Sequence, residues 1–187
     1  MTTSDFLSPE REKRIIEMAL GGDASQFCQL VRQYHKKIYF FIRRYLSEKV
    51  VAEDLTQETF LDAYQSLSRF RGEVRFLSWL MGIALNKVRN YLSRAPERRF
   101  DMLCLDHLFG QTDGDDPLAN VQQHEFVERL AGAVHSLSEE LKTPFMLVCF
   151  EELSYTEAAQ LLNVPEGTVK SRVFRARRQI MKILDKL

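Results

Sequence analysis

Apolar residues recur every three or four positions along most of the chain, and no segment alternates between apolar and polar residues for any length. This step is typical of amphipathic helices, whereas alternation would predict strands. In the N-terminal half the pattern predicts helices over residues 9–20, 24–46, 49–67 and 75–93. In the C-terminal half it predicts helices over residues 121–134 and 139–150 and then two shorter ones. The expected fold class is therefore all-α.

Capping residues and helix breakers mark the ends of several predicted helices. Asp23 follows a Gly-Gly break and is well placed to cap the long helix after it. Pro96 is expected to end the last helix of the N-terminal half, because the residue before a proline avoids the α region. Ser138 is expected to cap the helix that begins at residue 139, and Pro144 is expected to interrupt it.

A change in composition predicts a linker between two helical domains. Residues 100–120 hold five acids and no Lys or Arg, accompanied by two glycines and a proline. Such a segment is expected to be a flexible acidic linker. The predicted organisation is an N-terminal extension at residues 1–20, a first domain at 21–95, the linker at 96–120 and a second domain at 121–187.

Overall composition limits the classes of protein that fit. The 187 residues are 45% hydrophobic and carry a net charge of zero, so any nucleic-acid binding has to come from local patches. No run of about 18 apolar residues is present, and the N-terminus lacks an apolar signal core. These features predict a cytoplasmic protein without membrane insertion.

The cysteines and histidines offer little chemistry. Three widely spaced cysteines do not suggest a disulfide framework, and Cys28 and Cys149 are expected to be buried thiols. Cys104 and His107 have a possible metal-ligand spacing, but no second pair lies nearby. No nucleophile–base constellation or phosphate loop is evident. The sequence predicts no metal, no cofactor and no enzymatic activity.

Residues 151–178 predict two short helices joined by a tight turn. Ser154 and Glu157 have the spacing of a capping box at the start of the first helix. Residues 163–167 include a proline and a glycine and form the expected turn, and Thr168 is the expected N-cap of the second helix. Together these features are typical of a helix-turn-helix.

The second of these helices is basic. Val169 and Val173 can face inward, which leaves most of the polar side chains outside. Residues 167–187 hold seven basic residues against one acid, a local net charge of +6. A charged helix end alone is usually a solvated face, but this one follows a capped helix and a turn, and the combination favours DNA binding.

The helix over residues 49–67 combines an acidic face with apolar residues that do not all fit one stripe. The polar side chains of this face are those of Asp54, Gln57, Glu58 and Asp62. Phe60 and Leu61 are the apolar residues in question. An exposed aromatic beside acids indicates a protein partner, whereas a core phenylalanine on a solvated helix fits equally well, so both interpretations stay open.

Basic residues surround the helix over residues 75–93. Its expected core residues are Phe76, Trp79, Leu80, Ile83, Ala84, Val88 and Leu92. The bases around them are Arg69, Arg71, Arg75, Lys87, Arg89 and Arg94. Cations for phosphates and rings for unstacked bases suit single-stranded nucleic acid, although a packed helix with a solvated rim has the same composition.

Four groups of residues occur in an order that resembles a known family. They are Asp54-Leu-x-Gln-Glu-x-Phe60; Phe70-Arg-Gly-Glu-x-x-Phe76-x-x-Trp79-Leu; Ile83-Ala-x-Asn86; and Ser154-Tyr-x-Glu-x-Ala with Pro165-x-Gly-Thr-Val-Lys-Ser-Arg172. From about Gly21 onward the chain resembles the extracytoplasmic-function (group four) sigma factors of bacterial RNA polymerase, in the sigma-70 family. The resemblance implies two helical domains, the second and fourth sigma domains, and a promoter-specificity subunit.

The resemblance also implies which residues meet which partner. Binding to the β′ clamp helices of core RNA polymerase would fall to Asp54, Leu55, Gln57, Glu58 and Phe60. Minus-ten DNA would meet Phe70, Arg71, Phe76, Asn86, Lys87 and Asn90, with Phe70 and Asn86 at a pocket for a flipped base. Minus-thirty-five DNA would meet Thr168, Lys170, Ser171, Arg172, Phe174, Arg175 and Arg178.

Further partners implied by the resemblance are the polymerase β flap and an anti-sigma factor that holds the protein inactive until an environmental stress. Two other hypotheses remain from the residues alone. One is a classical helix-turn-helix regulator that binds operator DNA as a dimer, which the single recognition helix and the lack of a dimer heptad disfavour. The other is an enzyme or metal-dependent sensor built around Cys104 and His107.

Overall fold

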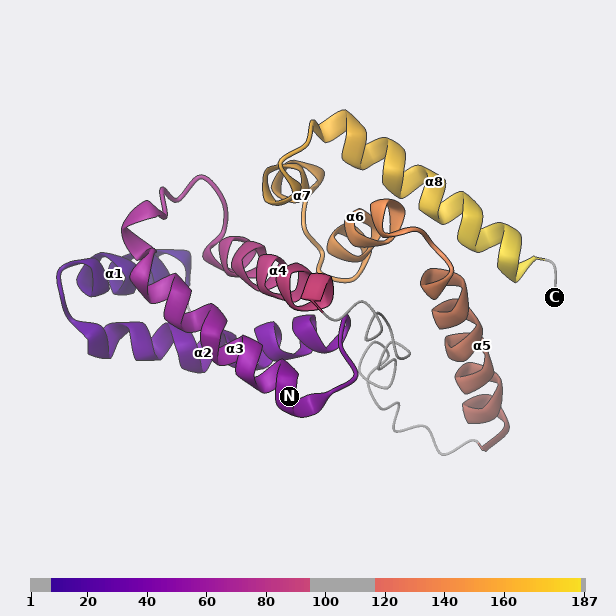
Figure 1. Cartoon of the computed structure of the whole chain (residues 1–187), viewed down its shortest axis with the longest axis horizontal. Helices are drawn as coiled ribbons and strands as arrows, with labels where there is room; N and C mark the ends of the chain where they lie inside the picture. The colour runs from indigo at the N-terminus through magenta and orange to yellow at the C-terminus, as the bar shows by residue number, and fades with distance from the viewer. Residues whose placement is uncertain (1–7, 95–116, 186–187) are drawn as a thin grey trace. The chain divides into compact units, whose positions relative to one another are not determined.

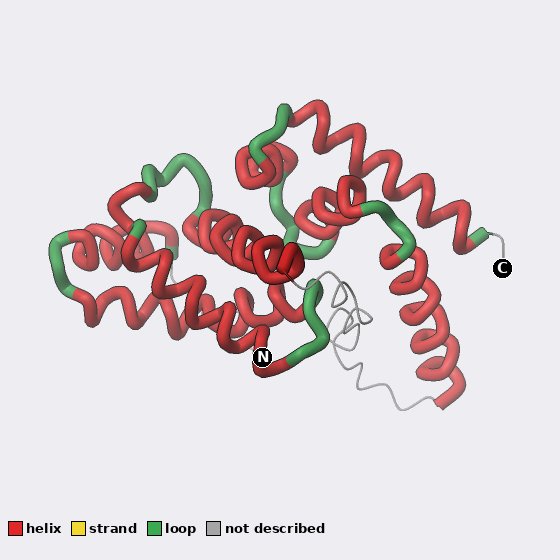
Figure 2. The backbone as a smooth tube through the Cα atoms, viewed as in Figure 1, coloured by secondary structure: helices red, strands yellow, loops and turns green. Residues whose placement is uncertain are grey.

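The computed structural model describes residues 8–94 and 117–185, whose regular elements are all helical (Figures 1 and 2). The N-terminal elements are α1 (Pro9–Leu20), α2 (Ala24–Arg43), α3 (Lys49–Gln65), the 3-10 turn η1 (Leu67–Arg69) and α4 (Phe76–Arg94). The C-terminal elements are α5 (Pro117–His135), α6 (Glu139–Cys149), α7 (Tyr155–Leu162) and α8 (Glu166–Leu184). The all-α prediction is confirmed for the described residues. The chain divides into two compact units, with α1 to α4 in the first and α5 to α8 in the second.

In the first unit, α2 and α4 supply most of the largest buried side chains. Those that solvent hardly reaches are Leu30, Ile38, Phe41, Ile42, Phe76, Leu80, Met81, Leu85 and Val88. Helix α1, which falls in the predicted N-terminal extension, also buries Ile15, Ile16 and Ala19 and contacts η1. The expected core residues Trp79 and Ile83 are only half-buried, because the buried stripe of α4 runs through Met81 and Leu85 instead.

Local hydrogen bonds explain where α2 begins and ends. Asp23 precedes the helix, and its carboxylate accepts from the Ser25 backbone N–H at 3.0 Å, as the capping prediction requires. The helix ends at Arg43 rather than at residue 46. The buried Arg43 side chain donates to the backbone oxygens of Leu46, at 2.8 Å, and of Ser47. This side chain thus satisfies carbonyls of a turn that the apolar pattern alone had assigned to the helix.

The buried face of α3 differs from the predicted one because it contains two threonines. Thr56 and Thr59 have no solvent exposure, and their hydroxyls donate to the carbonyls of Ala52 and Leu55, both at 2.7 Å. With those hydroxyls satisfied inside the helix, the buried residues form one regular stripe. Its members are Ala52, Leu55, Thr56, Thr59, Phe60 and Ala63. Phe60 therefore belongs to the core, and its interpretation as an exposed aromatic is wrong.

In the second unit, α5, α6 and α7 all pack against α8. Core side chains include Val134, Met146, Leu147, Ala158, Val169, Val173 and Ala176. Helix α5 starts at Pro117, four residues earlier than predicted. Pro144 does not interrupt α6, contrary to expectation, because in the second turn it removes a single backbone hydrogen bond. Ser138 stands at the N-cap position of α6, but its side chain makes no capping hydrogen bond.

The helix-turn-helix is present, with a shifted turn. The capping box of Ser154 and Glu157 is confirmed in both directions. The left-handed residue that ends α7 is Asn163, with φ 53° and ψ 49°, a conformation that asparagine tolerates. Pro165 is the N-cap of α8, so Thr168 lies inside that helix and is not its cap as predicted. Proline is favourable here because its missing N–H is one that the helix end leaves unbonded.

The cysteine prediction is wrong for one of the two described thiols and only partly right for the other. Cys28 is exposed, because it lies one residue beyond the buried Phe27 on α2, and Cys149 is half-buried. Cys104 and His107 fall outside the described residues, as does most of the predicted acidic linker. Within residues 8–94 and 117–185 there is no group of three His, Cys, Asp or Glu side chains that could hold a metal, and no helix long and apolar enough to cross a membrane.

The burial of Phe60 gives a direct test of the α3 packing. Phe60→Ala should lower the free energy of unfolding of the first unit by about 3–5 kcal/mol, as expected for a buried phenylalanine. Its neighbour Leu61 is 56% exposed, so Leu61→Ala should stay within about 0.5 kcal/mol. Urea unfolding followed by fluorescence of Trp79, the single tryptophan, reports on this unit. Equal losses for the two variants would contradict the assigned helix face.

Candidate nucleic-acid interface

The exposed side of α3 carries both acids and apolar residues. Asp54, Gln57 and Glu58 are exposed, as the polymerase-binding prediction requires. Leu55 and Phe60, predicted with them, are only 7% and 6% exposed and are core residues. Neither is accessible to a partner in this structure.

Other apolar side chains occupy the exposed side of this helix instead. Val50 is 74% exposed, Leu61 56% and Tyr64 41%. With Asp54 and Gln57 they follow one line along α3 at steps of three and four residues. The sequence contained this spacing, but it could be recognised only once the two threonines were known to lie on the opposite face. The line of Val50, Asp54, Gln57, Leu61 and Tyr64 is called the α3 surface below.

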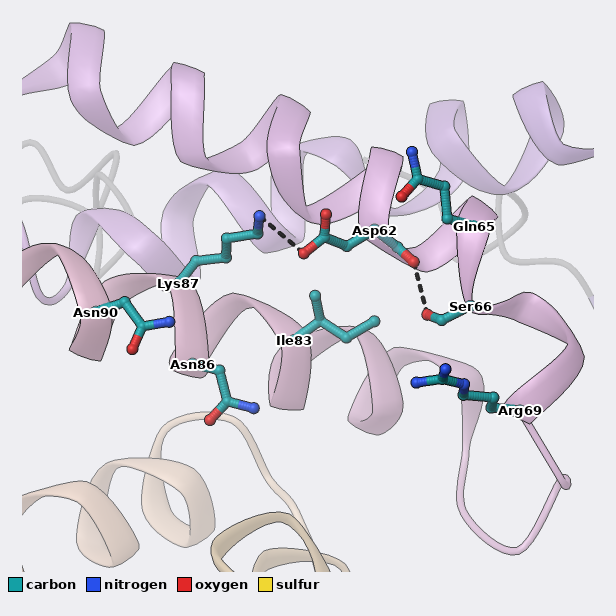
Figure 3. Close-up of a pocket in the computed structure, with 8 residues that line it drawn as sticks. All are labelled: Asp62, Gln65, Ser66, Arg69, Ile83, Asn86, Lys87 and Asn90. Atoms are coloured by element: carbon teal, nitrogen blue, oxygen red, sulfur yellow. Dashed lines mark hydrogen bonds and ion pairs between the residues drawn. The ribbon is translucent and has the colours of Figure 1, made fainter.

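A polar groove of about 560 Å³ lies where the end of α3 and η1 meet α4 (Figure 3). Its lining residues are Asp62, Gln65, Ser66, Arg69, Ile83, Asn86, Lys87 and Asn90. Three carboxamides and one guanidinium offer donors and acceptors around it, and Ile83 offers an apolar contact. The groove thus brings together three predicted minus-ten residues: Asn86, Lys87 and Asn90.

Two carboxylates of α3 hold Lys87 at the edge of this groove. Its Nζ lies 2.8 Å from Asp62 Oδ2 and 3.2 Å from Glu58 Oε2, and the side chain is 21% exposed (Figure 3 shows the Asp62 contact). Partial burial pulls the pKa of Lys87 down, but the hydrogen bonds to Asp62 and Glu58 outweigh this and leave the pKa above its usual value. Lys87 therefore ties α4 to the α3 carboxylates.

Phe70 does not line the groove. Its ring centroid lies 5.3 Å from those of both Phe76 and Trp79. Phe76 is 1% exposed, so it cannot contact a ligand at the surface in this structure. The three rings instead form a cluster that fixes the loop into the start of α4, beside the exposed Arg71.

On α8 the basic side chains divide into engaged and unengaged ones. Lys170 Nζ pairs with Glu166 at 2.6 Å. Arg172 donates through Nε and Nη2 to one oxygen of Glu140 on α6, at 3.1 and 2.6 Å, and Arg177 donates to Cys149 Sγ at 3.4 Å. These contacts join α8 to itself and to α6.

Within the part of the chain that the structure describes, the arginines among the other α8 residues predicted to meet DNA do not make such side-chain contacts. Arg175 and Arg178 are exposed and make no salt bridge or side-chain hydrogen bond with the described residues. Phe174 is 67% exposed, while Ser171 donates to the Thr168 carbonyl at 2.9 Å. Arginine forks and an apolar ring on one helix face suit guanine edges and thymine methyl groups in the major groove.

Both units match known protein families. Residues 30–98 match the family model described as Sigma-70 region 2, and residues 128–180 match that described as Sigma-70, region 4. Among curated proteins, the RNA polymerase sigma-H factor of Pseudomonas aeruginosa is 35% identical over 97% of this chain and 98% of its own length. The ECF RNA polymerase sigma-E factor of Haemophilus influenzae is 36% identical over 90% of this chain and 93% of its own length.

Solved structures share the fold. CnrH, in complex with the cytosolic domain of CnrY, matches with a TM-score of 0.68 at 24% identity, covering 94% of this chain and 97% of that one. The sigma factor RpoE of Bartonella quintana, in complex with the anti-sigma factor NepR, matches with a TM-score of 0.64 at 22% identity, covering 85% and 96%. Family models on both units and full-length relatives agree, and the chain belongs to the sigma-70 family of RNA polymerase sigma factors, in its extracytoplasmic-function group.

Proposed function

We propose that this chain is an alternative sigma factor that binds core RNA polymerase in the bacterial cytoplasm and directs initiation at a specific set of promoters. The match of both units to sigma regions, in the family order, carries this proposal. Such a factor is not an enzyme by itself. The polymerase supplies the chemistry, and the factor supplies contacts that select and open the promoter.

Core polymerase is proposed to bind the α3 surface. Asp54 and Gln57 offer polar contacts there, while Val50 and Leu61 expose apolar area that no described helix covers. Protein interfaces combine apolar contact area with polar contacts of this kind. As the family resemblance implies, we propose the β′ clamp helices as the partner of this segment and the β flap as the partner of the second unit.

Minus-ten DNA is proposed to bind the groove between α3, η1 and α4. Asn86 and Asn90 can donate to and accept from the edge of an unstacked base, and Ile83 can contact its face. Arg69 supplies a cation for the adjoining phosphate. Capture of a base that has left the duplex favours the melted state, because only that state gains these contacts.

Minus-thirty-five DNA is proposed to bind α8 in the major groove. Arg175 and Arg178 are unengaged cations among the predicted DNA-contacting residues of this helix, and Phe174 is an exposed apolar residue beside them. Arg172 donates two hydrogen bonds to one oxygen of Glu140, and these bonds hold α8 on α6. We assign Arg172 a positioning role and leave base reading to the exposed residues.

Regulation by an anti-sigma factor is part of the proposal. Two proteins of the same fold, CnrH and the sigma factor RpoE of Bartonella quintana, were solved with a bound protein, which for RpoE is the anti-sigma factor NepR. A chain whose polymerase surface is partly apolar gains from a partner that covers it. We propose an anti-sigma partner for this chain and a role in a stress or envelope response.

Transcription in vitro tests the function. Core polymerase together with this chain should produce discrete transcripts from a genomic template, and sequencing their 5′ ends should reveal two shared upstream elements. Core polymerase alone is the control. Absence of binding to core and of promoter-directed transcripts would remove the proposal. A tight dimeric complex of the chain alone with duplex operator would instead favour the classical helix-turn-helix regulator.

Leu61 on the α3 surface offers a sharper test of polymerase binding. Leu61→Asp should weaken binding to core polymerase about tenfold or more, equivalent to about 1.4 kcal/mol, because it places a charge in an apolar contact. Leu20→Asp is the matched control, since Leu20 on α1 is 48% exposed in the same unit. Fluorescence titration of labelled chain with core polymerase measures both. Equal weakening by the two substitutions would contradict the assigned surface.

Substitution of Asn86 tests whether the groove binds an unstacked base. Asn86→Ala should reduce open-complex formation about tenfold, since a bidentate base contact is worth about 1–3 kcal/mol. Binding to a duplex that contains only the upstream element should stay unchanged. Permanganate reactivity of promoter thymines reports opening. Ser93→Ala, an exposed polar substitution on α4 outside the groove, is the control, and equal loss of opening and upstream binding by Asn86→Ala would count against base capture.

A further inference from the structure

One acid interrupts the basic surface of the recognition helix. Glu166 is the first residue of α8 and the only carboxylate within it. It begins a line of residues four apart, which continues through Lys170, Phe174 and Arg178 along one side of the helix. The N-terminal part of a recognition helix is the part that meets base edges. In the proposed role of α8, Glu166 therefore brings a negative charge close to DNA, whose phosphates repel it.

Two contacts hold this carboxylate in place. Thr156 Oγ1 on α7 donates to Glu166 Oε2 at 2.8 Å, and Lys170 Nζ lies 2.6 Å from Glu166 Oε1. Lys170 also sits 5.8 Å from the centroid of the Tyr155 ring. The cluster thus connects both helices of the helix-turn-helix through side chains on its outer surface.

The cluster contributes little to folding stability. The Lys170 and Glu166 side chains are 57% and 41% exposed, and exposed pairs of this kind add little to the free energy of unfolding. Hydrogen bonds from Lys170 and Thr156 lower the pKa of Glu166, and the bond to Glu166 raises the pKa of Lys170, so both groups are charged near neutral pH. The first cation of the DNA-facing line is therefore neutralised by its own neighbour.

We propose that Glu166 is a specificity-determining residue, which masks Lys170 and excludes phosphate from the start of the recognition helix. Phosphate contacts raise affinity for every DNA sequence, whereas base contacts discriminate among sequences. By weakening the phosphate contacts, Glu166 makes binding depend on the base contacts of Phe174, Arg175 and Arg178. This inference rests on the proposed role of α8 at the upstream promoter element.

The test compares two duplexes. One carries the upstream element that wild-type holoenzyme selects from a randomised promoter library, and the other has the same composition in scrambled order. Anisotropy titrations of the full chain at about 0.05 to 0.3 M salt give affinities and the salt dependence for both duplexes. Competition of the two sequences for holoenzyme gives the discrimination directly.

Glu166→Gln should strengthen binding to the scrambled duplex roughly 5-fold at about 0.15 M salt. The slope of the logarithm of its binding constant against the logarithm of salt concentration should become more negative by about 0.9, as one added phosphate contact requires. Binding to the selected duplex should rise less, so the discrimination ratio should fall. In a Lys170→Gln background the effect of Glu166→Gln should shrink, because the masked cation is gone. The melting temperature should not change.

Glu125→Gln provides the matched control, because it removes the same charge from an exposed position on α5 and should leave both affinities unchanged. Unchanged scrambled-duplex binding in Glu166→Gln would overturn the inference, as would a loss at a single base position, which would make Glu166 a direct reader. A lowered melting temperature with weaker binding to both duplexes would show a structural role only. If wild-type holoenzyme selects no upstream element, the proposed function itself fails.

Discussion

The hydrogen bonds of Thr56 and Thr59 to the carbonyls of their own helix allow α3 to bury a face that contains two hydroxyls. A hydroxyl without a partner in the core would destabilise the fold, so this local satisfaction is what permits α3 to bury these positions. The buried face of α3 then determines which side chains are exposed on the opposite face. It places Phe60 in the core and leaves Leu61 exposed.

The same packing creates the groove and couples it to α3. Asp62 and Glu58 lie at the edge of the buried stripe, close enough to hold Lys87 of α4. The residue predicted to bind DNA phosphate thus already has two anionic partners. The groove and the α3 carboxylates therefore share this one ammonium group, so a change at Asp62 or Glu58 would alter the surroundings of Lys87.

On α8, pairing rather than residue count determines the positive charge that DNA meets. Arg172 and Arg177 contact α6, and Lys170 contacts Glu166, whereas Arg175 and Arg178 remain exposed without a described partner. With part of its cations engaged, we expect this helix to bind duplex DNA weakly by itself. In the proposed function, polymerase would link it to a second contact at the groove and raise the effective concentration of each, so that the assembled complex binds more tightly than either unit.

The sequence by itself determined the helical class, most helix boundaries, the capping box at Ser154 and the family, because periodicity, capping spacing and motif order are properties of neighbouring residues. It could not determine which apolar residues stay outside or which cations are paired. Those outcomes depend on contacts between helices: Phe60 is buried through the α3 packing, Phe70 packs on Phe76 and Trp79, and Arg172 reaches Glu140 on another helix. Only the tertiary structure brings such residues together, so only it decided which predicted contacts are accessible to DNA and polymerase.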